Sequence, residues 1–373
     1  MAVDRNSGDR SELYIGLMSG TSLDGVDAVL ADFTSPAPRV LAHVHRPFAQ
    51  DLRAELLALT APGANEIERS GVAAQRLVGV YAHCVADVLQ RADRAAADIG
   101  AIGAHGQTVR HRPEAGYSLQ LNAPALLAEL TQIDVVADFR SRDLAAGGQG
   151  APLVPAFHAA AFSSDVPRAV VNIGGISNVT VLPAAGQDLL GFDCGPGNLL
   201  LDAWATQHRA EPFDRNGEFA ATGRLDPELL ERLLAEPFLD RAPPKSTGRE
   251  LFSQAWLGSA LVGIARPPQD VQRTLTEFTA RCIGDAIKRW CASARDVVVC
   301  GGGVRNATLM TALAGEVAPR PLLTSSALGI EPDHVEALAF AWLARRCKRR
   351  ETGSIPAVTG ARGARILGAI YPR

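Results

Sequence analysis

Alternating apolar and polar positions near the start of the chain predict a β-hairpin. Residues 13–18 form a short apolar run, residues 19–25 are mostly polar or glycine, and residues 26–33 are apolar at most alternate positions. A period of two is typical of a half-buried strand, and a short apolar run bounded by Gly, Ser and Asp is typical of a strand that ends in a turn. We therefore expect two strands joined by a tight polar turn.

The same pattern recurs in the middle of the chain. An apolar run at residues 169–173 is followed by Gly174 and Gly175 and then by a second strand candidate at residues 176–182. Apolar residues with helical spacing occupy long stretches elsewhere, most clearly residues 66–94, 226–294 and 334–346. Strands that alternate with helices predict an α/β protein with mixed sheets, and the repeated hairpin suggests two related halves.

Length, charge and cysteine usage narrow the class of protein. At 373 residues the chain is long enough for two or three domains, and a net charge of −3 gives no reason to expect nucleic acid or a membrane as partner. Residues 1–12 are polar and lack the apolar core of a signal peptide, and the six cysteines are scattered without a Cys-x-x-Cys pair. We expect a cytoplasmic protein of two lobes.

Several common nucleotide and hydrolase motifs are absent. None of the lysines, Lys245, Lys288 and Lys348, follows a glycine, which excludes the P-loop. Residues 195–200 begin like a dinucleotide fingerprint but have a leucine where the third glycine is needed for close packing of helix on strand. Gly-x-Ser-x-Gly and His-Glu-x-x-His are also missing, which disfavours simple serine-hydrolase and zincin chemistry.

The first candidate site is the turn of the first hairpin and the start of the strand that follows. Its members are Gly20, Thr21, Ser22, Leu23, Asp24, Gly25, Val26 and Asp27. Glycines let a ligand approach the backbone, and successive N–H groups with nearby hydroxyls can bind phosphate oxygens. Asp24 and Asp27 could hold Mg²⁺, directly or through water. The alternative is an ordinary hairpin turn whose Ser and Asp side chains bond to their own backbone.

Two further candidates lie where strands end. Asp193 follows an apolar run and precedes a glycine-containing turn, so it could act as a general base. Its alternative role is to cap the following helix or to brace the turn. Gly301, Gly302 and Gly303 join a strand to a helix, and three glycines would let a flat ligand lie against the backbone. The alternative there is a flexible connecting loop.

Together these features resemble the nucleotide-binding layout of the actin, hexokinase and heat-shock-70 superfamily, and further motifs resemble one family, the anhydro-N-acetylmuramic acid kinases. The motifs are Gly16–Gly25, Ala104–Thr108, Ala137–Arg140, Gly147–Pro155, Asn172–Gly175, Phe192–Asn198, Pro244–Glu250 and Gly301–Gly303. The resemblance implies a two-lobed, actin/hexokinase-like (ribonuclease H-like) ATPase fold with an interdomain cleft. It places residues 1–138 and 355–373 in one lobe and residues 139–354 in the other. Lys245 and Arg249 belong to a matching motif without an assigned role.

The resemblance also implies a reaction. Family members use ATP and Mg²⁺ to phosphorylate O6 of 1,6-anhydro-N-acetylmuramic acid while water opens the anhydro bridge at C1, which gives N-acetylmuramic acid 6-phosphate for peptidoglycan recycling. The family's catalytic aspartate matches Asp193, and Glu336 matches a glutamate expected to help orient the water; its alternative is a solvated acid on a surface helix. Asp24 and Asp193 would hold Mg²⁺, directly or through water. Residues 174–175 would form the second phosphate loop and residues 301–303 the adenosine platform.

Four residues are expected to contact the amino sugar. His105 and Gln107 could hydrogen-bond its hydroxyls or its N-acetyl group, and Arg140 or Arg142 could pair with its lactyl carboxylate, because a planar guanidinium binds both oxygens. A homodimer is a further expectation from the resemblance. Two alternatives remain open: a kinase of the same fold acting on another sugar, and a nucleotide-dependent binding protein that closes on its ligand without turnover.

Overall fold

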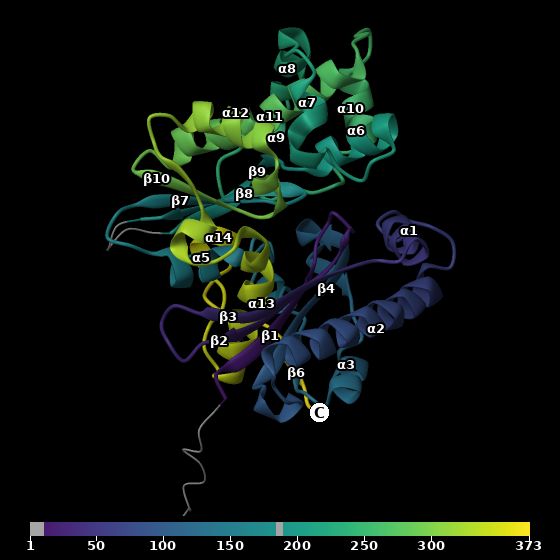
Figure 1. Ribbon diagram of the computed structural model, residues 1–373, viewed down its shortest axis with the longest axis vertical. Helices are drawn as coiled ribbons and strands as arrows, with labels where there is room; N and C mark the ends of the chain where they lie inside the picture. Colours follow the sequence, from purple (N-terminus) through teal and green to yellow (C-terminus); the bar gives the residue numbers. More distant parts are fainter. Residues whose placement is uncertain (1–10, 184–188) are drawn as a thin grey trace, which may run out of the picture.

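The computed structural model describes residues 11–183 and 189–373. The predicted lobes also include residues 1–10 and 184–188, which lie outside the described residues. The described chain forms two mixed β-sheets, one above the other in Figure 1, with helices on their faces. The α/β class and the two-lobed arrangement expected from the sequence are confirmed.

The first sheet is built mainly from the N-terminal part of the chain. Its seven strands are β1 (Leu13–Ser19), β2 (Gly25–Asp32), β3 (Arg39–Pro47), β4 (Ala101–Arg112), β5 (Tyr117–Leu121), β6 (Val135–Ala137) and β12 (Ala369–Tyr371). The strand order is β12-β6-β4-β1-β2-β3, and β5 pairs with β4. Strand β12 brings the C-terminal end of the chain back to this sheet, antiparallel to β6.

The second sheet is built from the middle of the chain and repeats the connectivity of the first. Its five strands are β7 (Arg168–Ile173), β8 (Ile176–Leu182), β9 (Leu190–Pro196), β10 (Asp296–Cys300) and β11 (Leu322–Thr324), in the order β11-β10-β7-β8-β9. In each sheet three antiparallel strands are followed by two strands parallel to the first of them: β1–β2–β3 with β4 and β6, and β7–β8–β9 with β10 and β11. The two related halves suggested by the paired hairpins are visible in this common topology.

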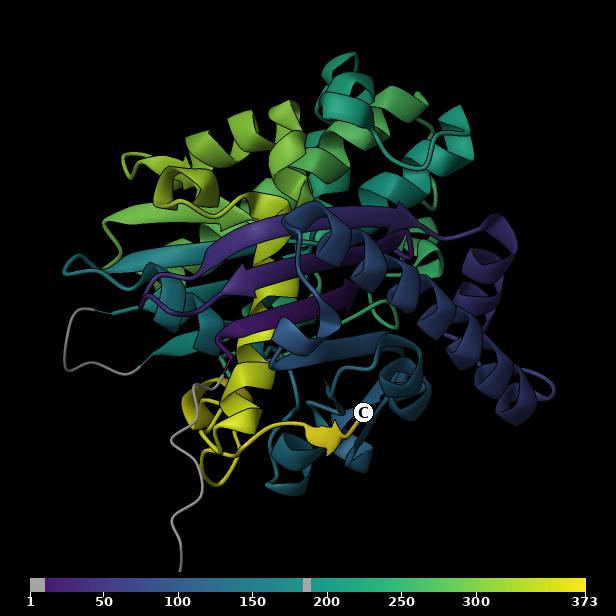
Figure 2. The same ribbon diagram turned by 60° about the horizontal axis from the view of Figure 1, so that its bottom comes forward.

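Helices connect and cover the two sheets. They are α1 (Gln50–Ala58), α2 (Glu66–Ala92), α3 (Pro124–Thr131), α4 (Ser141–Ala145), α5 (Val154–Phe162), α6 (Leu199–Arg209), α7 (Glu218–Ala221), α8 (Pro227–Leu234), α9 (Pro237–Asp240), α10 (Gln254–Ala260), α11 (Pro268–Trp290), α12 (Ala307–Val317), α13 (Val335–Lys348) and α14 (Pro356–Thr359). Figures 1 and 2 show α2 and α13 on opposite faces of the first sheet.

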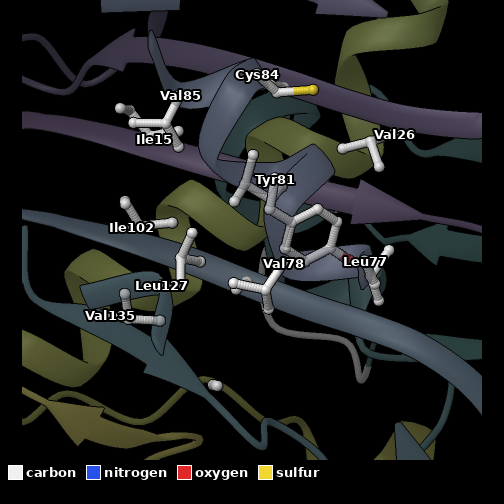
Figure 3. Close-up of a cluster of buried hydrophobic side chains, with 14 of the residues drawn as sticks. Ile15, Val26, Leu77, Val78, Tyr81, Cys84, Val85, Ile102, Leu127 and Val135 are labelled. Carbon is white, nitrogen blue, oxygen red and sulfur yellow. The ribbon is translucent and has the colours of Figure 1, made fainter. Parts of the chain in front are cut away.

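Alternate residues of the first sheet pack on these two helices. Ile15 of β1 and Ile102 of β4 lie in one buried cluster with Tyr81 and Val85 of α2, as Figure 3 shows. Among the described residues α2 is the one helix long and apolar enough to cross a membrane. Its apolar face is packed against this sheet, as in the core helix of a globular domain.

Helix α13 approaches the opposite face so closely that two strands carry glycine at the contact. A Cβ atom on Gly16 of β1 would overlap the carbonyl oxygen of Ala337, and one on Gly103 of β4 would overlap that of Phe340. Helix α13 also belongs to a buried cluster that contains Val170 and other residues of the second sheet. It therefore lies between the sheets, and the expected division at residues 139–354 stays a prediction.

Candidate active site

The glycine turns of the two hairpins face each other. The first, residues 20–24, connects β1 to β2, and the second, Gly174 and Gly175, connects β7 to β8. A Cβ atom on Gly175 would come within 2.6 Å of the Thr21 Oγ1 atom. Only glycine allows this approach without displacement of the facing turn. The structure thus brings the two predicted phosphate loops together, one from each sheet.

Three side chains hold the first turn by its carbonyl groups. Gln107 on β4 donates from Nε2 to the Gly20 oxygen over 3.1 Å, Arg53 on α1 donates from Nε to the Leu23 oxygen over 3.0 Å, and Arg249 donates to the Thr21 oxygen. Within residues 11–183 and 189–373, nothing accepts the N–H groups of Thr21 and Ser22. The turn is fixed from one side, and these two donors are available to an anion on the other.

The two aspartates of this segment have different surroundings. The Asp24 Oδ1 atom accepts a hydrogen bond of 2.6 Å from the Ser22 hydroxyl. Asp27 lies on β2, where its Oδ1 atom is 3.0 Å from His43 Nε2 and 3.1 Å from His45 Nδ1 of β3. Burial opposes ionisation of Asp27, but the hydrogen bonds from the two histidines outweigh it and lower its pKa. Asp27 is therefore an ionised carboxylate at neutral pH.

Asp193 is a buried carboxylate inside β9. It is 7% exposed, its N–H donates to the Lys245 oxygen over 3.1 Å, and its Oδ2 atom accepts 2.9 Å from the N–H of Thr247. Burial raises its pKa to about 7, although the Thr247 N–H group and the positive charge of Arg140 oppose this shift. Asn198 is the N-cap residue of α6, so the capping role considered for Asp193 is wrong.

Glu336 is the second carboxylate with a displaced pKa. It lies in the first turn of α13, where its Oε1 atom accepts a hydrogen bond of 3.2 Å from Asn172 Nδ2 of β7. Burial raises its pKa to about 7, the negative charge of Asp27 adds to the rise, and Asn172 and Arg140 oppose it. The alternative of a solvated surface acid is therefore wrong.

Arg140 lies close enough to both carboxylates for their charges to act on it. Burial lowers its pKa to about 10, and the negative charges of Asp193 and Glu336 counter that shift. Its Nη1 atom donates to the Gly150 oxygen over 2.7 Å and its Nη2 atom to His105 Nε2 over 2.8 Å. Among the described residues the buried Nε atom has no partner. Arg140 is thus a cation close to two carboxylates, and its Nε–H group is an unused donor.

The remaining residues expected to contact the sugar differ in position. His105 is buried, burial and then the charge of Arg140 lower its pKa to about 3, and its ring packs on Phe340 at 4.6 Å. As a neutral ring that accepts from Arg140, it supports the guanidinium. Gln107 supports the first turn, and its Oε1 atom has no partner within the described chain. Arg142 is exposed on α4, and no contact of the described residues joins it to this cluster.

The triple glycine lies beside the end of β7. Gly301 has a φ of 82°, and a Cβ atom there would come within 2.6 Å of Asn172 Oδ1, while one on Gly303 would overlap Ile173. Gly302 is exposed and has open space on its side-chain side. The loop therefore packs against the residue that holds Glu336 and leaves a bare backbone surface at its centre.

Acidic residues near the first turn give this part of the site an excess of negative charge. Burial raises the pKa of Asp202 in α6 to about 7, and the negative charge of Asp24 adds to the rise; Glu336 is raised in the same way by Asp27 and Asp24. Among the described residues no three His, Cys, Asp or Glu form a complete metal site. Mg²⁺ takes one or two carboxylates with water and phosphate oxygens, so this excess of negative charge fits Mg²⁺.

Three residues with a place in the site were missed by sequence reasoning. Asn172 and Arg249 lie inside motifs that were noted, but their partners, Glu336 and the Thr21 carbonyl, are far away in the chain. Asp202 lies on the first turn of an amphipathic helix, where an acid is commonplace, and nothing in the sequence marks it as a neighbour of Asp24. Only the folded structure shows that these three residues lie next to other residues of the site.

Comparison with known proteins shows the family of the chain. The family model "Anhydro-N-acetylmuramic acid kinase" matches residues 12–373. A protein of that name from Bordetella petrii is 57% identical over 365 residues, which cover 96% of each chain, and one from Cupriavidus metallidurans is 54% identical over 373 residues, 97% of this chain and 98% of the relative.

Solved structures are much more distant. The activator of the 2-hydroxyisocaproyl-CoA dehydratase from Clostridium difficile with bound ADPNP aligns with a TM-score of 0.48 and 13% identity, over 91% of this chain and 96% of that one. Similarity at this level adds nothing to the match of the family model over nearly the whole chain. The chain belongs to the anhydro-N-acetylmuramic acid kinase family and is a kinase.

Proposed function

We propose that the protein phosphorylates O6 of 1,6-anhydro-N-acetylmuramic acid from ATP while water opens the anhydro bridge at C1, giving N-acetylmuramic acid 6-phosphate. One observation carries the proposal: two carboxylates held by hydrogen bonds, Asp193 by Thr247 and Glu336 by Asn172, lie close enough to Arg140 for their charges to act on it. The facing glycine turns, Thr21 against Gly175, supply the place for phosphates. The name shared by the relatives points to the same sugar.

The chemistry of this substrate requires two bond changes to be linked. O6 is tied into the bridge to C1 and has no proton to lose, so it becomes a nucleophile only as its bond to C1 breaks. The oxygen of water forms the new bond to C1, and one proton of that water must leave. O6 then bonds to the γ-phosphorus, and ADP departs. Such a site needs a base for water and positive groups for phosphate.

Asp193 is the base in this scheme. A general base acts best when its pKa lies near the working pH, and the pKa of Asp193 is raised to about 7. The Thr247 N–H group holds the Oδ2 atom, so the orientation of the carboxylate is fixed. Glu336, held by Asn172, would orient the attacking water. Arg140 would pair with the lactyl carboxylate through its unpartnered Nε group and compensate the charge of both acids.

The nucleotide would lie between the two sheets. Residues 20–25 and residues 174–175 would bind its phosphates, chiefly through the N–H groups of Thr21 and Ser22, which have no acceptor among the described residues, and the bare backbone at residues 301–303 would receive its adenosine. Asp24 and Asp193 would hold Mg²⁺, in part through water, and when bound this ion neutralises phosphate charge. His105, Gln107 and Arg142 stay candidates for sugar contacts; a cytoplasmic location and a homodimer are further expectations.

The test compares two sugars and one variant. With ATP, the parent protein should form a 6-phosphate from 1,6-anhydro-N-acetylmuramic acid, and phosphate transfer only to the ring-opened sugar would overturn the proposal. Asp193→Asn should abolish turnover and largely spare binding of a non-hydrolysable ATP analogue. A near-normal rate in this variant would show that the base lies elsewhere. Binding without any turnover in the parent protein would instead indicate a sensor.

A further inference from the structure

We propose that Arg249 is a positioning residue that couples occupancy of the phosphate-binding turn to the setting of the base, acting through residues 245–249, here called the strap. The inference rests on the proposed function, because it takes residues 20–24 as the phosphate turn and Asp193 as the base. It gives a role to the motif Pro244–Glu250, which the proposed chemistry leaves unused.

The strap is anchored at its first residue. Lys245 is 6% exposed, and its Nζ atom donates to the Phe238 and Leu239 oxygens over 3.1 and 2.9 Å. The ammonium also lies 4.7 Å from the centre of the Phe238 ring. Two of the three ammonium N–H groups thus bond to main-chain oxygens, and the charge lies over an aromatic ring, so these contacts fix the position of Lys245.

The middle of the strap holds the base. The Lys245 oxygen accepts from the N–H of Asp193, and the N–H of Thr247 donates to the Asp193 carboxylate. The strap therefore runs beside β9. Its main-chain groups bond both to the N–H group and to the carboxylate of Asp193. A displacement of the strap would move or remove a hydrogen bond to the carboxylate.

The end of the strap crosses to the other sheet. Arg249 donates to the Thr21 oxygen in the turn between β1 and β2, while Asp202 of α6 attracts the guanidinium and Arg53 repels it. Burial lowers the pKa of Arg249. The strap is thus tied at one end to the second sheet and at the other to the phosphate turn.

The planarity of the peptide unit explains how this contact could sense phosphate. The Thr21 carbonyl and the Ser22 N–H belong to one trans peptide unit, so they point in opposite directions. A phosphate that accepts from the Ser22 N–H polarises this unit and strengthens the bond from Arg249 to the Thr21 oxygen. Binding of phosphate to the turn would therefore reduce the motion of the strap. The strap would then hold the Asp193 carboxylate in place.

The two other side chains that hold the turn lack this connection. Gln107 holds the Gly20 oxygen and Arg53 holds the Leu23 oxygen, both from elements of the first sheet. Arg53 is therefore a matched control: it is also an arginine that donates to a carbonyl of the same turn, but no hydrogen bond joins it to the strap, and its charge only repels that of Arg249. Its loss should weaken nucleotide binding and leave the coupling intact.

Amide hydrogen exchange of residues 246–249 tests the coupling. In the parent protein a saturating, non-hydrolysable ATP analogue should slow this exchange at least threefold. The slowing should persist in Arg53→Met and disappear in Arg249→Met, which keeps an apolar stem of similar length, and Arg249→Lys should restore part of it. Unchanged exchange in the parent protein, or slowing retained in Arg249→Met, would overturn the proposal. The parent arm needs no variant and therefore stands even if Arg249→Met fails to fold.

Turnover supplies the second readout. With both substrates saturating, Arg249→Met should lower kcat at least tenfold, whereas the main effect of Arg53→Met should be a higher KM for ATP. A kcat within twofold of the parent value in Arg249→Met would show that the strap does not serve the base. If Asp193 were not the base, Asp193→Asn would keep its turnover while the exchange result stood, so failure of the proposed function would be recognised separately.

Discussion

Asp193→Asn should stabilise the fold while it abolishes turnover. The carboxylate is 7% exposed, and burial raises its pKa from 3.8 to about 7 against the opposing effects of the Thr247 N–H group and Arg140. Asparagine has the same shape and can accept the Thr247 N–H with its amide oxygen. It carries no charge at any pH, so it removes the cost of burying an ionised group.

The magnitude follows from proton linkage. In the folded state the carboxyl holds its proton to higher pH than in the unfolded state, so the folded state loses stability as pH rises from about 4 to about 7, and the loss is constant above that range. A displacement from 3.8 to about 7 corresponds to roughly 4 kcal/mol. The NH₂ group of asparagine needs a partner of its own, which costs about 1–3 kcal/mol. We therefore expect Asp193→Asn to be more stable than the parent protein by about 2 kcal/mol at pH 8 and less stable by about 1–3 kcal/mol at pH 4.

Urea unfolding followed by tryptophan fluorescence measures this gain between pH 4.5 and 8.5. Asp143→Asn is the matched control, because Asp143 is fully buried and accepts from the Gly150 N–H over 2.8 Å and from the Thr359 hydroxyl over 2.7 Å. Its loss of an acceptor should destabilise the protein at every pH. An Asp193→Asn variant whose stability relative to the parent protein did not increase with pH would refute the reasoning.

Three further predictions concern other parts of the site and the fold. Glu336→Gln should lower kcat about 10- to 100-fold with little change in the KM for ATP, since it removes the charge that orients water; steady-state kinetics would show it. Gly16→Ala should lower the free energy of unfolding by about 1–3 kcal/mol, because a Cβ would overlap the backbone of α13. Gly79→Ala should raise it by about 0.5–1 kcal/mol, because this position in α2 has open space for a Cβ. His105→Phe should raise the KM for the sugar at least tenfold, because the arginine bonded to the histidine loses its acceptor, and an unchanged KM would contradict that role.

Local sequence patterns predicted the elements but not their contacts. The two hairpins and the helices at residues 66–92 and 335–348 follow from periodicity, since one face of each is buried. The passage of α13 between the sheets could not be predicted, because a glycine in a strand does not say which backbone approaches it. Gly16 and Gly103 acquire that meaning only in the folded chain.

For the site, too, the sequence indicated which residues have suitable chemistry but not where their side chains lie. Asp193 could be singled out because an acid beside glycines after an apolar run is suited to catalysis, and its burial agrees with that role; its expected place at a strand end is wrong, because β9 continues to Pro196. Arg140 and Arg142 could not be told apart, although the charges of Asp193 and Glu336 act on the first and the second is exposed. Whether Gln107 contacts a ligand or the backbone depends on the distance to Gly20, which is 3.1 Å here and is invisible in the sequence.

Incubation in ¹⁸O-labelled water shows which atom the attacking water reaches. The substrates are 1,6-anhydro-N-acetylmuramic acid and ATP, and the reaction is stopped early and analysed by mass spectrometry of the product. Unlabelled product kept in the same water for the same time corrects for exchange at C1. The account predicts one solvent oxygen at C1 and none in the transferred phosphate. Label in the phosphate, or product without label at C1, would contradict it.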